Sequence, residues 1–588
     1  MNNKEPNIIM KSRIFIVLFI FILTFIYIIV NYYNIQVLKN DFYTQKALES
    51  QMREFKITAN RGTIYDRNGE KLAYSILRYR VYLDKVNFDK SNKDKLIKIL
   101  SIDSKKFEDI YSSERRRISI KRHVSHKTIE KLKQESFQGI WYTDDPYRIY
   151  PYNSFASRTI GSIDIDQNGI FGIEYVFDNT LKGKDGKITM KTDGAGRQLP
   201  YGEKKVIKPI QGSNIYLTID EVIQHFTEKA IQKGLEKTEA KSVSAIVMNV
   251  KTGEILSMAS TPNFDLNNPR VKPENISKEK YDNMDSKQKV NLWNEFWKNP
   301  IISNTLEPGS TFKIITAAIG LETGVVRPQS EFNEHVGKGY IDVYGSRLKC
   351  WVYPRSHKEE TLIQALENSC NPVFVKVIQR IGLEDFYKNL LTFGLNDKIN
   401  IELPGINQYK IPKKENIGPV ELATISYGHG IAVTPLKLLK VLSGVINEGR
   451  LVEPRILKKV ENESTNEVNK TESNVKRKIV SKDTSREMKL MLESVVLNGS
   501  GKYANIPGIR IGGKTGTTTK IVDGEYDDEK LRMSFFAFAP VEDPEISLLV
   551  IVDEPEKGDF SSTVAGPIAK DILESSLRYL GIKPGFKE

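Results

Sequence analysis

Glu307-Pro308-Gly309-Ser310-Thr311-Phe312-Lys313 is the stretch that says most about this 588-residue sequence. Its first three residues are typical of a turn, and residues 314–321 are apolar over a length that predicts a buried helix closed by Gly324. Ser310 and Lys313, three positions apart in the first helical turn, then share one face of that helix. A hydroxyl beside an amine that can remove its proton is what nucleophilic catalysis by serine requires.

Two further short strings follow in the chain, Ser369-Cys370-Asn371 and Lys514-Thr515-Gly516-Thr517. Each string alone is weak. Ser277-Lys278-Glu279-Lys280 repeats the first pattern in a charged run, and Lys251-Thr252-Gly253 repeats the third in a predicted hairpin turn. All three strings in order and in suitable contexts predict a serine acyl-transfer enzyme whose general base is a lysine.

Ser310 is the predicted nucleophile and Lys313 its base, which works only as the neutral amine. Lowering the pKa of a lysine from about 10.4 to about 7 requires about 4 to 5 kcal/mol of bias against the ammonium form. Three sources of that bias are expected: burial against the apolar helix, the positive end of the helix dipole, and a second cation, Lys514.

The second string is expected to serve proton transfer and substrate binding. Ser369 supplies a hydroxyl that can pass the proton to the leaving amine, and Asn371 can orient Lys313 and hold a substrate amide. Residues 361–368 have helical spacing, so Ser369 is expected where that helix ends.

The third string predicts a strand edge that binds substrate. Gly516 has no side chain, so substrate backbone could lie flat against it, while Lys514, Thr515 and Thr517 offer a cation and hydroxyls to a terminal carboxylate. The backbone N–H groups of Ser310 and Thr517 are the expected oxyanion hole.

The N-terminus predicts one membrane span. Residues 14–30 are Ile, Phe, Val, Leu and Tyr with one Thr, and the span is placed at residues 14–33. Lys4, Lys11 and Arg13 precede it, which favours a cytoplasmic tail at residues 1–13 and an extracytoplasmic catalytic domain. No small-residue cleavage site follows Val30, so an uncleaved single-pass anchor in the cytoplasmic membrane is expected.

Composition excludes several functions. The net charge of +13 is spread along the chain, which makes nucleic acid a poor partner. Cys350 and Cys370 are the only cysteines; they could pair outside the cytoplasm, and their state is left open. The six histidines form no HExxH motif and no Cys/His cluster along the sequence, so no metal site is predicted. No cofactor is predicted either.

The pattern of segments predicts an α+β protein with several parts. The catalytic domain should hold an antiparallel sheet flanked by helices, preceded by a mixed, strand-rich pedestal. The polar stretch from Lys458 to about Lys482 is interpreted as a linker. The predicted parts are a stem at 38–55, a strand-rich pedestal domain at 56–210 and a catalytic domain at 215–582.

Over nearly its whole length the chain resembles class B penicillin-binding proteins, which are monofunctional peptidoglycan D,D-transpeptidases. Besides the three strings, the likeness rests on the segments Arg61 to Glu70, Arg148 to Pro151, Gly172 to Glu174 with Leu181 to Gly183, and Leu217 to Asp220 with Gln224. The resemblance implies that Ser310 is acylated, Lys313 is the base, Ser369 and Asn371 form the second motif, and Lys514 to Thr517 bind the substrate carboxylate and the oxyanion. Two departures, Lys358 after His357 and His429 where Gln is common, bear on fine substrate recognition.

The resemblance implies a membrane-anchored enzyme that cross-links peptidoglycan stem peptides through a Ser310 acyl-enzyme and is inhibited by β-lactams. Chain length and the lack of a C-terminal repeat favour the septal, cell-division type over the sporulation and elongation types. Expected partners are a separate membrane glycosyltransferase and divisome proteins. Alternatives left open are a β-lactam-hydrolysing enzyme or carboxypeptidase, and a penicillin-binding sensor or scaffold without transpeptidation.

Overall fold

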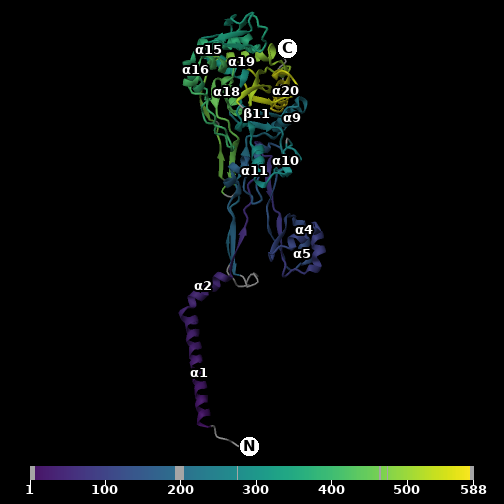
Figure 1. Cartoon of the computed structure of the whole chain (residues 1–588), viewed down its shortest axis with the longest axis vertical. Helices are drawn as coiled ribbons and strands as arrows, with labels where there is room; N and C mark the ends of the chain where they lie inside the picture. Colours follow the sequence, from purple (N-terminus) through teal and green to yellow (C-terminus); the bar gives the residue numbers. More distant parts are fainter. Residues whose placement is uncertain are drawn as a thin grey trace. The chain divides into compact units, whose positions relative to one another are not determined.

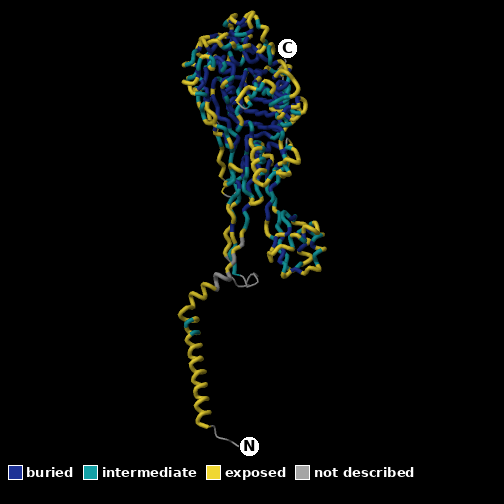
Figure 2. The backbone as a smooth tube through the Cα atoms, viewed as in Figure 1, coloured by how far each residue is buried: buried dark blue, intermediate teal, exposed yellow. Residues whose placement is uncertain are grey.

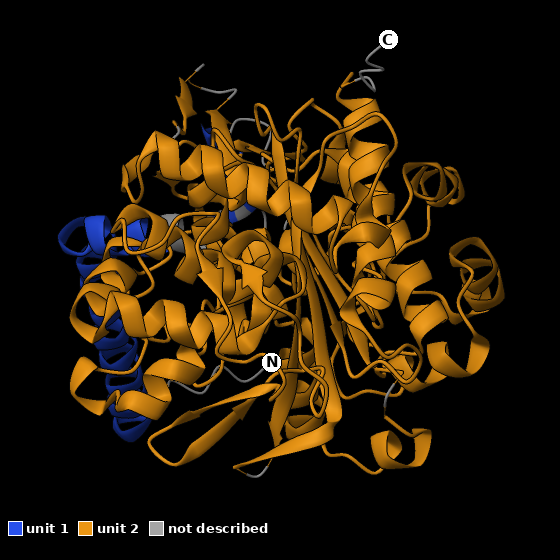
Figure 3. Ribbon diagram, turned by 90° about the horizontal axis from the view of Figure 1, so that it is seen from above, with its two compact units in different colours: residues 1–59, 183–211 blue, residues 60–182, 212–588 orange. Residues whose placement is uncertain are grey.

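The structure is a computed structural model that describes residues 7–582 apart from 192–203, 275, 463–464, 466, 473 and 523 (Figure 1). Its residues divide into two compact units, one of residues 1–59 and 183–211 and one of residues 60–182 and 212–588 (Figure 3). Each unit is described by itself.

The smaller unit begins with the apolar helix α1 (Ile8–Tyr33), which continues through a π-helical turn (Asn34–Leu38). Within the 31 residues from Ile8 to Leu38, a stretch of 18 has a mean hydropathy of 3.0, and none of these 18 residues is buried in the protein, as the mostly exposed colouring in Figure 2 shows. This helix is long and apolar enough to cross a membrane. The polar helix α2 (Asn40–Gln51) follows and leads into a three-stranded antiparallel sheet of β1 (Met52–Ile57), β8 (Gly186–Lys191) and β9 (Lys204–Ile207).

A six-stranded sheet in the larger unit joins strands from distant parts of the chain in the order β19-β18-β10-β2-β3-β7. β2 pairs in parallel with β10, and β10 pairs antiparallel with β18. The segment interpreted as a linker therefore forms strands, and that prediction is wrong. The bounds are β2 Ile64–Tyr65, β3 Lys71–Ile76, β7 Tyr147–Ile149, β10 Asn214–Leu217, β18 Leu457–Asn462, β19 Glu467–Lys470 and, in a separate pair with β17 (Arg450–Val452), β20 Val475–Lys478.

A buried ion network lies beside this sheet. It joins three of the pedestal segments on which the family resemblance rests, those that contain Arg61, Arg148 and Glu174. Glu174 is fully buried and accepts hydrogen bonds from Arg61 (Nε to Oε2, 2.7 Å) and Arg148 (Nε to Oε1, 2.8 Å). Arg61 also contacts Asp178 at 2.7 Å, and the Tyr150 hydroxyl donates to Glu174 at 3.2 Å. Buried charges are tolerated only when paired in this way.

A small lobe with its own hydrophobic core is formed by the part of the chain between β3 and β7. Its sheet has the order β5-β4-β6, and three short helices cover it. The hydrophobic core between them includes Leu83, Leu96 and Phe107. The bounds are β4 Tyr79–Asp84, β5 Arg117–Val124, β6 Ile140–Asp144, α3 Lys93–Leu100, α4 Ser104–Tyr111 and α5 His126–Glu135.

The catalytic part is built on a five-stranded antiparallel sheet in the order β12-β11-β23-β22-β21. Alternate side chains of each strand enter two different cores: Val247, for example, packs with α9 and α20, and Ile246 packs on the opposite face with the helices that carry the first and second strings. The expected α+β class with a helix-flanked antiparallel sheet is thereby confirmed. The bounds are β11 Ser242–Asn249, β12 Ile255–Ser260, β21 Gly512–Val522, β22 Glu525–Ala539, β23 Ile546–Asp553, α9 Glu221–Thr238 and α20 Ser561–Tyr579.

Two helices on the second face, α13 and α14, form where the sequence predicts them. The apolar run after Lys313 is α13 (Lys313–Glu322), with every residue from Lys313 to Gly320 buried. Further helices are α14 Leu362–Glu367, α15 Asn371–Ile381, α16 Leu383–Thr392, α17 Pro419–Ile425, α18 Pro435–Ile446 and α19 Lys482–Leu497. Short elements complete the unit: α6 Ser157–Ile160, α7 Gly172–Val176, α8 Asp178–Lys182, α10 Lys278–Asp282, α11 Ser286–Trp297, α12 Pro300–Ser303, β13 Glu331–Phe332, β14 Tyr340–Val343, β15 Ser346–Lys349 and β16 Glu360–Thr361.

Candidate active site

Ser310 lies in a short 3-10 turn (Gly309–Phe312) that runs directly into α13. Gly309 adopts a positive φ of 54°, and a Cβ there would lie 2.8 Å from the carbonyl oxygen of Thr517 on β21. Only glycine fits this close approach without strain. The turn therefore sets the half-buried Ser310 against the strand that carries the third string.

Lys313, the first residue of α13, is fully buried and points at the second string. Its Nζ donates to the Ser369 carbonyl oxygen at 2.7 Å, to the Ser369 Oγ at 3.2 Å and to the Asn371 Oδ1 at 2.7 Å. Burial lowers the pKa of Lys313 to about 8, against the opposing pull of Cys350, Cys370 and Glu360. A substantial neutral fraction near pH 8 is what a general base needs.

Ser369 lies between α14 and α15 with a positive φ of 56°, which is uncommon for a residue with a side chain. Lys514 donates from Nζ to the Ser369 Oγ at 3.0 Å, so this hydroxyl is within hydrogen-bond reach of two lysine nitrogens. Burial and the charge of Lys313 lower the pKa of Lys514 well below its usual range. The arrangement can move a proton between Lys313, Ser369 and Lys514.

The strand β21 presents the third string beside the nucleophile. Thr515 is buried and donates from Oγ1 to the Ser500 Oγ at 3.2 Å, whereas Thr517 is exposed. Ser561, at the start of α20, donates to the Gly516 carbonyl oxygen at 2.6 Å and also contacts the Thr517 hydroxyl. Ser500 and Ser561 were not identified from the sequence, because neither belongs to a motif.

Gly516 is required for packing inside the protein. A Cβ at this position would lie 2.5 Å from the Ser534 Oγ and 3.0 Å from the Pro308 carbonyl oxygen. The missing side chain thus lets β21 approach both β22 and the turn before Ser310. The structure therefore explains the glycine at position 516 by packing within the protein, and not by the flat contact with substrate that we expected.

The structure brings together the predicted site residues from three separated segments. Lys313, Ser369, Asn371 and Lys514 form one connected hydrogen-bond network. Ser310 precedes this network on the same turn, and Thr515, Gly516 and Thr517 continue from Lys514 along β21. Their chemical roles remain predictions.

Glu307 ties the turn to a neighbouring wall of the site. Its Oε1 accepts from the Gly430 N–H at 2.8 Å and from the Tyr526 hydroxyl at 3.0 Å, and burial raises its pKa. His429 packs edge-on against Tyr427, with ring centroids 5.3 Å apart. Burial, together with the charge of Lys313, lowers the pKa of His429 to about 4, so this imidazole is neutral at pH 7.

Two cysteines and a histidine lie close together outside this network. Cys350 and Cys370 are free, buried thiols, and His357 lies with its Nδ1 3.8 Å from the Cys350 Sγ. The fold thus assembles a Cys/His cluster that the spacing along the sequence did not indicate.

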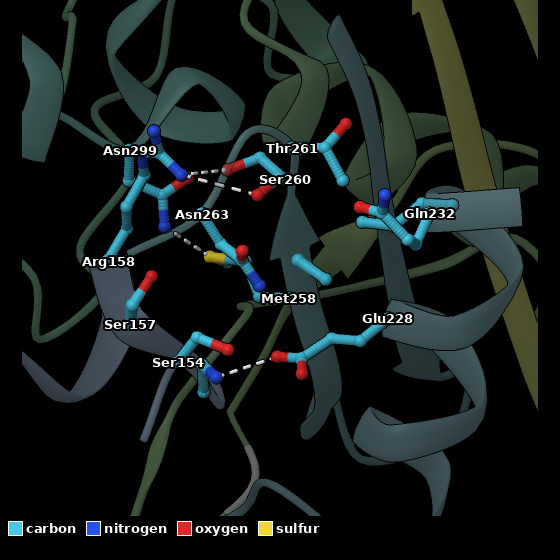
Figure 4. Close-up of a pocket in the computed structure, with 13 residues that line it drawn as sticks. Ser154, Ser157, Arg158, Glu228, Gln232, Met258, Ser260, Thr261, Asn263 and Asn299 are labelled. Carbon is cyan, nitrogen blue, oxygen red and sulfur yellow. Dashed lines mark hydrogen bonds between the residues drawn. The ribbon is translucent and has the colours of Figure 1, made fainter. Parts of the chain in front are cut away.

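A separate cavity of about 290 Å³ lies between residues 154–158, α9 and β12 (Figure 4). Arg158 lines it and donates to the carbonyl oxygens of Phe296 and Ser260. Glu228 also lines it; its Oε1 accepts from the Ala156 N–H at 2.7 Å and from the Gln224 Nε2 at 2.8 Å. Burial raises the pKa of Glu228 to about 7.

The site and the fold together are typical of serine acyl-transfer proteins with a penicillin-binding fold: a serine on a turn, a lysine pair joined through a second serine, and a glycine-bearing strand on a helix-flanked sheet. Two family models match the chain: the penicillin-binding protein transpeptidase domain over residues 243–574 and the penicillin-binding protein dimerisation domain over residues 56–217. The chain belongs to the class B penicillin-binding protein family.

Individual relatives agree with this assignment. The chain is 33% identical to "Stage V sporulation protein D" of Bacillus subtilis, covering 98% of this chain and 87% of that protein. It is 28% identical to a "Peptidoglycan D,D-transpeptidase FtsI homolog" of Mesostigma viride, covering 97% and 96%. The crystal structure of Penicillin Binding Protein 2X from Streptococcus thermophilus shares the fold, with a TM-score of 0.75 at 22% identity over 90% of this chain and 81% of that one.

Proposed function

We propose that the chain is a membrane-anchored peptidoglycan D,D-transpeptidase that works through a covalent acyl-enzyme at Ser310 in septal wall synthesis. The observation that carries the proposal is the Ser369 hydroxyl, held within 3.0 Å of Lys514 and 3.2 Å of Lys313. A hydroxyl between two buried amines of lowered pKa is suited to passing to a leaving amine the proton that Lys313 takes from the nucleophile.

In the proposed first step, neutral Lys313 removes the proton of Ser310 and the Ser310 Oγ attacks the carbonyl carbon of the penultimate D-alanine. The C–N bond to the terminal D-alanine breaks, and the leaving nitrogen receives a proton through Ser369. The backbone N–H groups of Ser310 and Thr517 stabilise the oxyanion, a contribution of about 2.7 to 4 kcal/mol for each donor.

In the second step an amine of a neighbouring stem peptide attacks the acyl carbon and forms a new amide cross-link. The ester bond to Ser310 breaks, and the proton of the amine passes through Lys313 to the Ser310 Oγ. A β-lactam takes the place of the stem peptide: Ser310 opens the ring, and the leaving nitrogen stays attached to the acyl group. Lys514, Thr515 and Thr517 bind the carboxylate of either molecule, with Asn371 on the substrate amide.

The decisive experiment is intact mass spectrometry of the full chain in detergent after incubation with a penicillin. The parent should gain one stable adduct, Ser310→Ala should gain none, and Ser277→Ala should behave as the parent. Ser277 is a matched control because it heads the same Ser-x-x-Lys pattern with Lys280, on the short exposed helix α10. Rapid adduct loss with antibiotic hydrolysis would favour a β-lactamase, and no adduct on the folded parent would favour a scaffold.

A second assay separates transfer from hydrolysis. Supplied with a stem pentapeptide and an acceptor amine, the parent should release D-alanine and form the cross-linked product in equal amounts. Release of D-alanine without a cross-linked product would identify a carboxypeptidase.

For membrane topology we propose that α1 is an uncleaved single-pass anchor, with residues 1–13 in the cytoplasm and the catalytic domain outside. The exposed apolar surface of α1 and the basic residues Lys11 and Arg13 near its start support this orientation. Protease added to intact spheroplasts should digest the catalytic domain, and its protection would reverse the assignment.

For the cellular role we propose septal synthesis beside a separate membrane glycosyltransferase and divisome proteins, supported by relatives named FtsI homologs. A sporulation role is the second candidate, because the relative "Stage V sporulation protein D" matches 98% of this chain at 33% identity. A fluorescent fusion should gather at vegetative division sites if the role is septal. A signal confined to developing spores would select the second candidate.

A further inference from the structure

Directly behind the second string, five side chains with metal-binding atoms meet in a buried cluster: Cys350, Cys370, His357, Glu360 and His335. Each is at most 3% exposed, except His357, whose side chain is 14% exposed. They come from the end of β15, the loop after it, β16, the start of α15 and the loop after β13. Protein interiors hold such groups only when they are paired, hydrogen-bonded or bound to a metal.

The hydrogen bonds of this cluster are incomplete. Among the residues that the structure describes, the His335 Nε2 and the Glu360 Oε2 are buried without a hydrogen-bond partner. These two atoms lie 3.5 Å apart, and the Glu360 Oε2 lies 3.6 Å from the His357 Nδ1. The Glu360 Oε1, by contrast, accepts from the Asn368 Nδ2 at 2.7 Å. The orphaned Glu360 oxygen, beside the His357 imidazole and the thiols, points to a bound group at these atoms, and the His335 Nε2 lies close enough to orient the carboxylate.

The spacings match the edges of a tetrahedral zinc site. With Zn–S near 2.3 Å, Zn–N near 2.05 Å and Zn–O near 2.1 Å, neighbouring ligand atoms should be about 3.6 Å apart for S and N and about 3.4 Å for N and O. The observed distances are 3.8 Å from the Cys350 Sγ to the His357 Nδ1 and 3.6 Å from the His357 Nδ1 to the Glu360 Oε2. The ligand atoms of Cys350, His357 and Cys370 all lie within 4.8 Å of one another.

We propose that Cys350, Cys370 and His357 bind a structural zinc ion, with the Glu360 Oε2 as the fourth ligand and His335 as the group that orients Glu360. Two thiolates with an imidazole and a carboxylate favour Zn²⁺ over Mg²⁺ or Ca²⁺, which prefer oxygen ligands alone. The ion replaces the protons of the two thiols. Two protons are released, and the net charge of the cluster stays the same.

The proposed zinc site is linked through the backbone to the second string, because Cys370 lies between Ser369 and Asn371 in the chain. A bond from the Cys370 Sγ to zinc would fix the backbone that holds Ser369 at its positive φ and holds Asn371 2.7 Å from the Lys313 Nζ. In this arrangement Cys370 and the zinc ion position catalytic groups and do not touch substrate.

Zinc binding to the full chain in detergent, kept reduced and dialysed against Zn²⁺ alone, tests the proposal. We expect the parent to hold about one zinc per chain, and Cys350→Ser and His357→Ala to lose most of it. His335→Ala should bind zinc about 10 to 100-fold more weakly, as expected for an orienting group. His225→Ala is the matched control, an exposed histidine on α9, and should bind zinc as the parent does.

Cobalt gives a second, spectroscopic readout. Loaded with Co²⁺ in place of zinc, the parent should show the near-ultraviolet charge-transfer absorption of a cobalt–thiolate bond, and Cys350→Ser should weaken it. Three outcomes would overturn the proposal: a folded parent that binds no zinc, a cobalt spectrum without a thiolate band, or a chain isolated under thiol-trapping conditions whose two cysteines form a disulfide.

Discussion

The Nζ of Lys514 donates a hydrogen bond to the Ser369 Oγ at 3.0 Å, although 145 residues separate them in the chain. The Nζ of Lys313, in the first string, donates to the same oxygen at 3.2 Å. The Ser369 hydroxyl is thus within hydrogen-bond reach of both buried lysines, and on the proposed mechanism its removal should affect proton transfer more than substrate binding.

Replacement of Ser369 by alanine tests this expectation. We expect Ser369→Ala to slow acylation by a penicillin about 10² to 10⁴-fold, the usual contribution of a positioned proton-transfer group. Stopped-flow measurement of acylation over a range of penicillin concentrations separates the rate constant from the binding constant. Ser136→Ala, an exposed serine in the small lobe, is the control, and acylation of Ser369→Ala at the parent rate would refute the relay.

Acylation should depend on pH through the lysine pair. Because burial lowers the pKa of Lys313 to about 8, and only the neutral amine accepts a proton, the rate should rise about tenfold per pH unit below 8 and level off above it. The observed inflection belongs to the coupled Lys313–Lys514 pair. His429→Gln should keep this inflection, since the pKa of His429 is about 4, and a flat profile from pH 6 to 9 would contradict the assignment.

The buried ion network around Glu174 should contribute strongly to the free energy of unfolding of the pedestal. Glu174→Gln removes the charge that Arg61 and Arg148 share, and uncompensated buried charges typically cost about 3 to 5 kcal/mol. Urea unfolding should show a lower midpoint. Asp571→Asn, which removes only the exposed ion pair with Lys233 at 2.8 Å, should leave the midpoint unchanged. Equal midpoints for Glu174→Gln and the parent would show that the buried network contributes nothing.

Glu228 makes stability depend on pH in a direction opposite to most carboxylates. The pKa of Glu228 is raised to about 7 in the folded protein from 4.5, so the folded state keeps a proton that the unfolded state releases. Stability should therefore fall as pH rises from about 4.5 to 7, by at most about 3 kcal/mol. Glu228→Gln should remove this fall, and Glu236→Gln, at an exposed position on the same helix, should preserve it. The difference in urea midpoint between pH 5 and pH 8 measures the effect.

The sequence predicted the local structure around the three strings, because each string is short and its surroundings are set by neighbouring residues. Ser310 and Lys313 share one helical turn, and Ser369 follows directly on the end of α14, so short-range spacing defined their surroundings. The Cys/His cluster escaped prediction because its members come from five elements, and the six residues between Cys350 and His357 match no usual metal-site spacing.

The interpretation of residues 458–482 as a linker was wrong for a related reason. The strands in this segment consist mostly of charged and polar residues. β18 is half-buried and β19 and β20 are mostly exposed, so no apolar periodicity marks them as strands. Pairing of β18 with β10 supplies the hydrogen bonds, and that partner lies more than 200 residues earlier in the chain.

The six-stranded sheet also constrains the order in which the molecule can be completed. β2 ends at Tyr65, while β18, on the far side of β10, begins at Leu457. As the ribosome makes the chain from its N-terminus, β2 and β3 must wait through most of synthesis before the last strands of their sheet exist. The sheet can therefore be completed only after β18 and β19 have been made, and until then the strand edge of β10 that β18 covers is open to a chaperone or to a neighbouring chain.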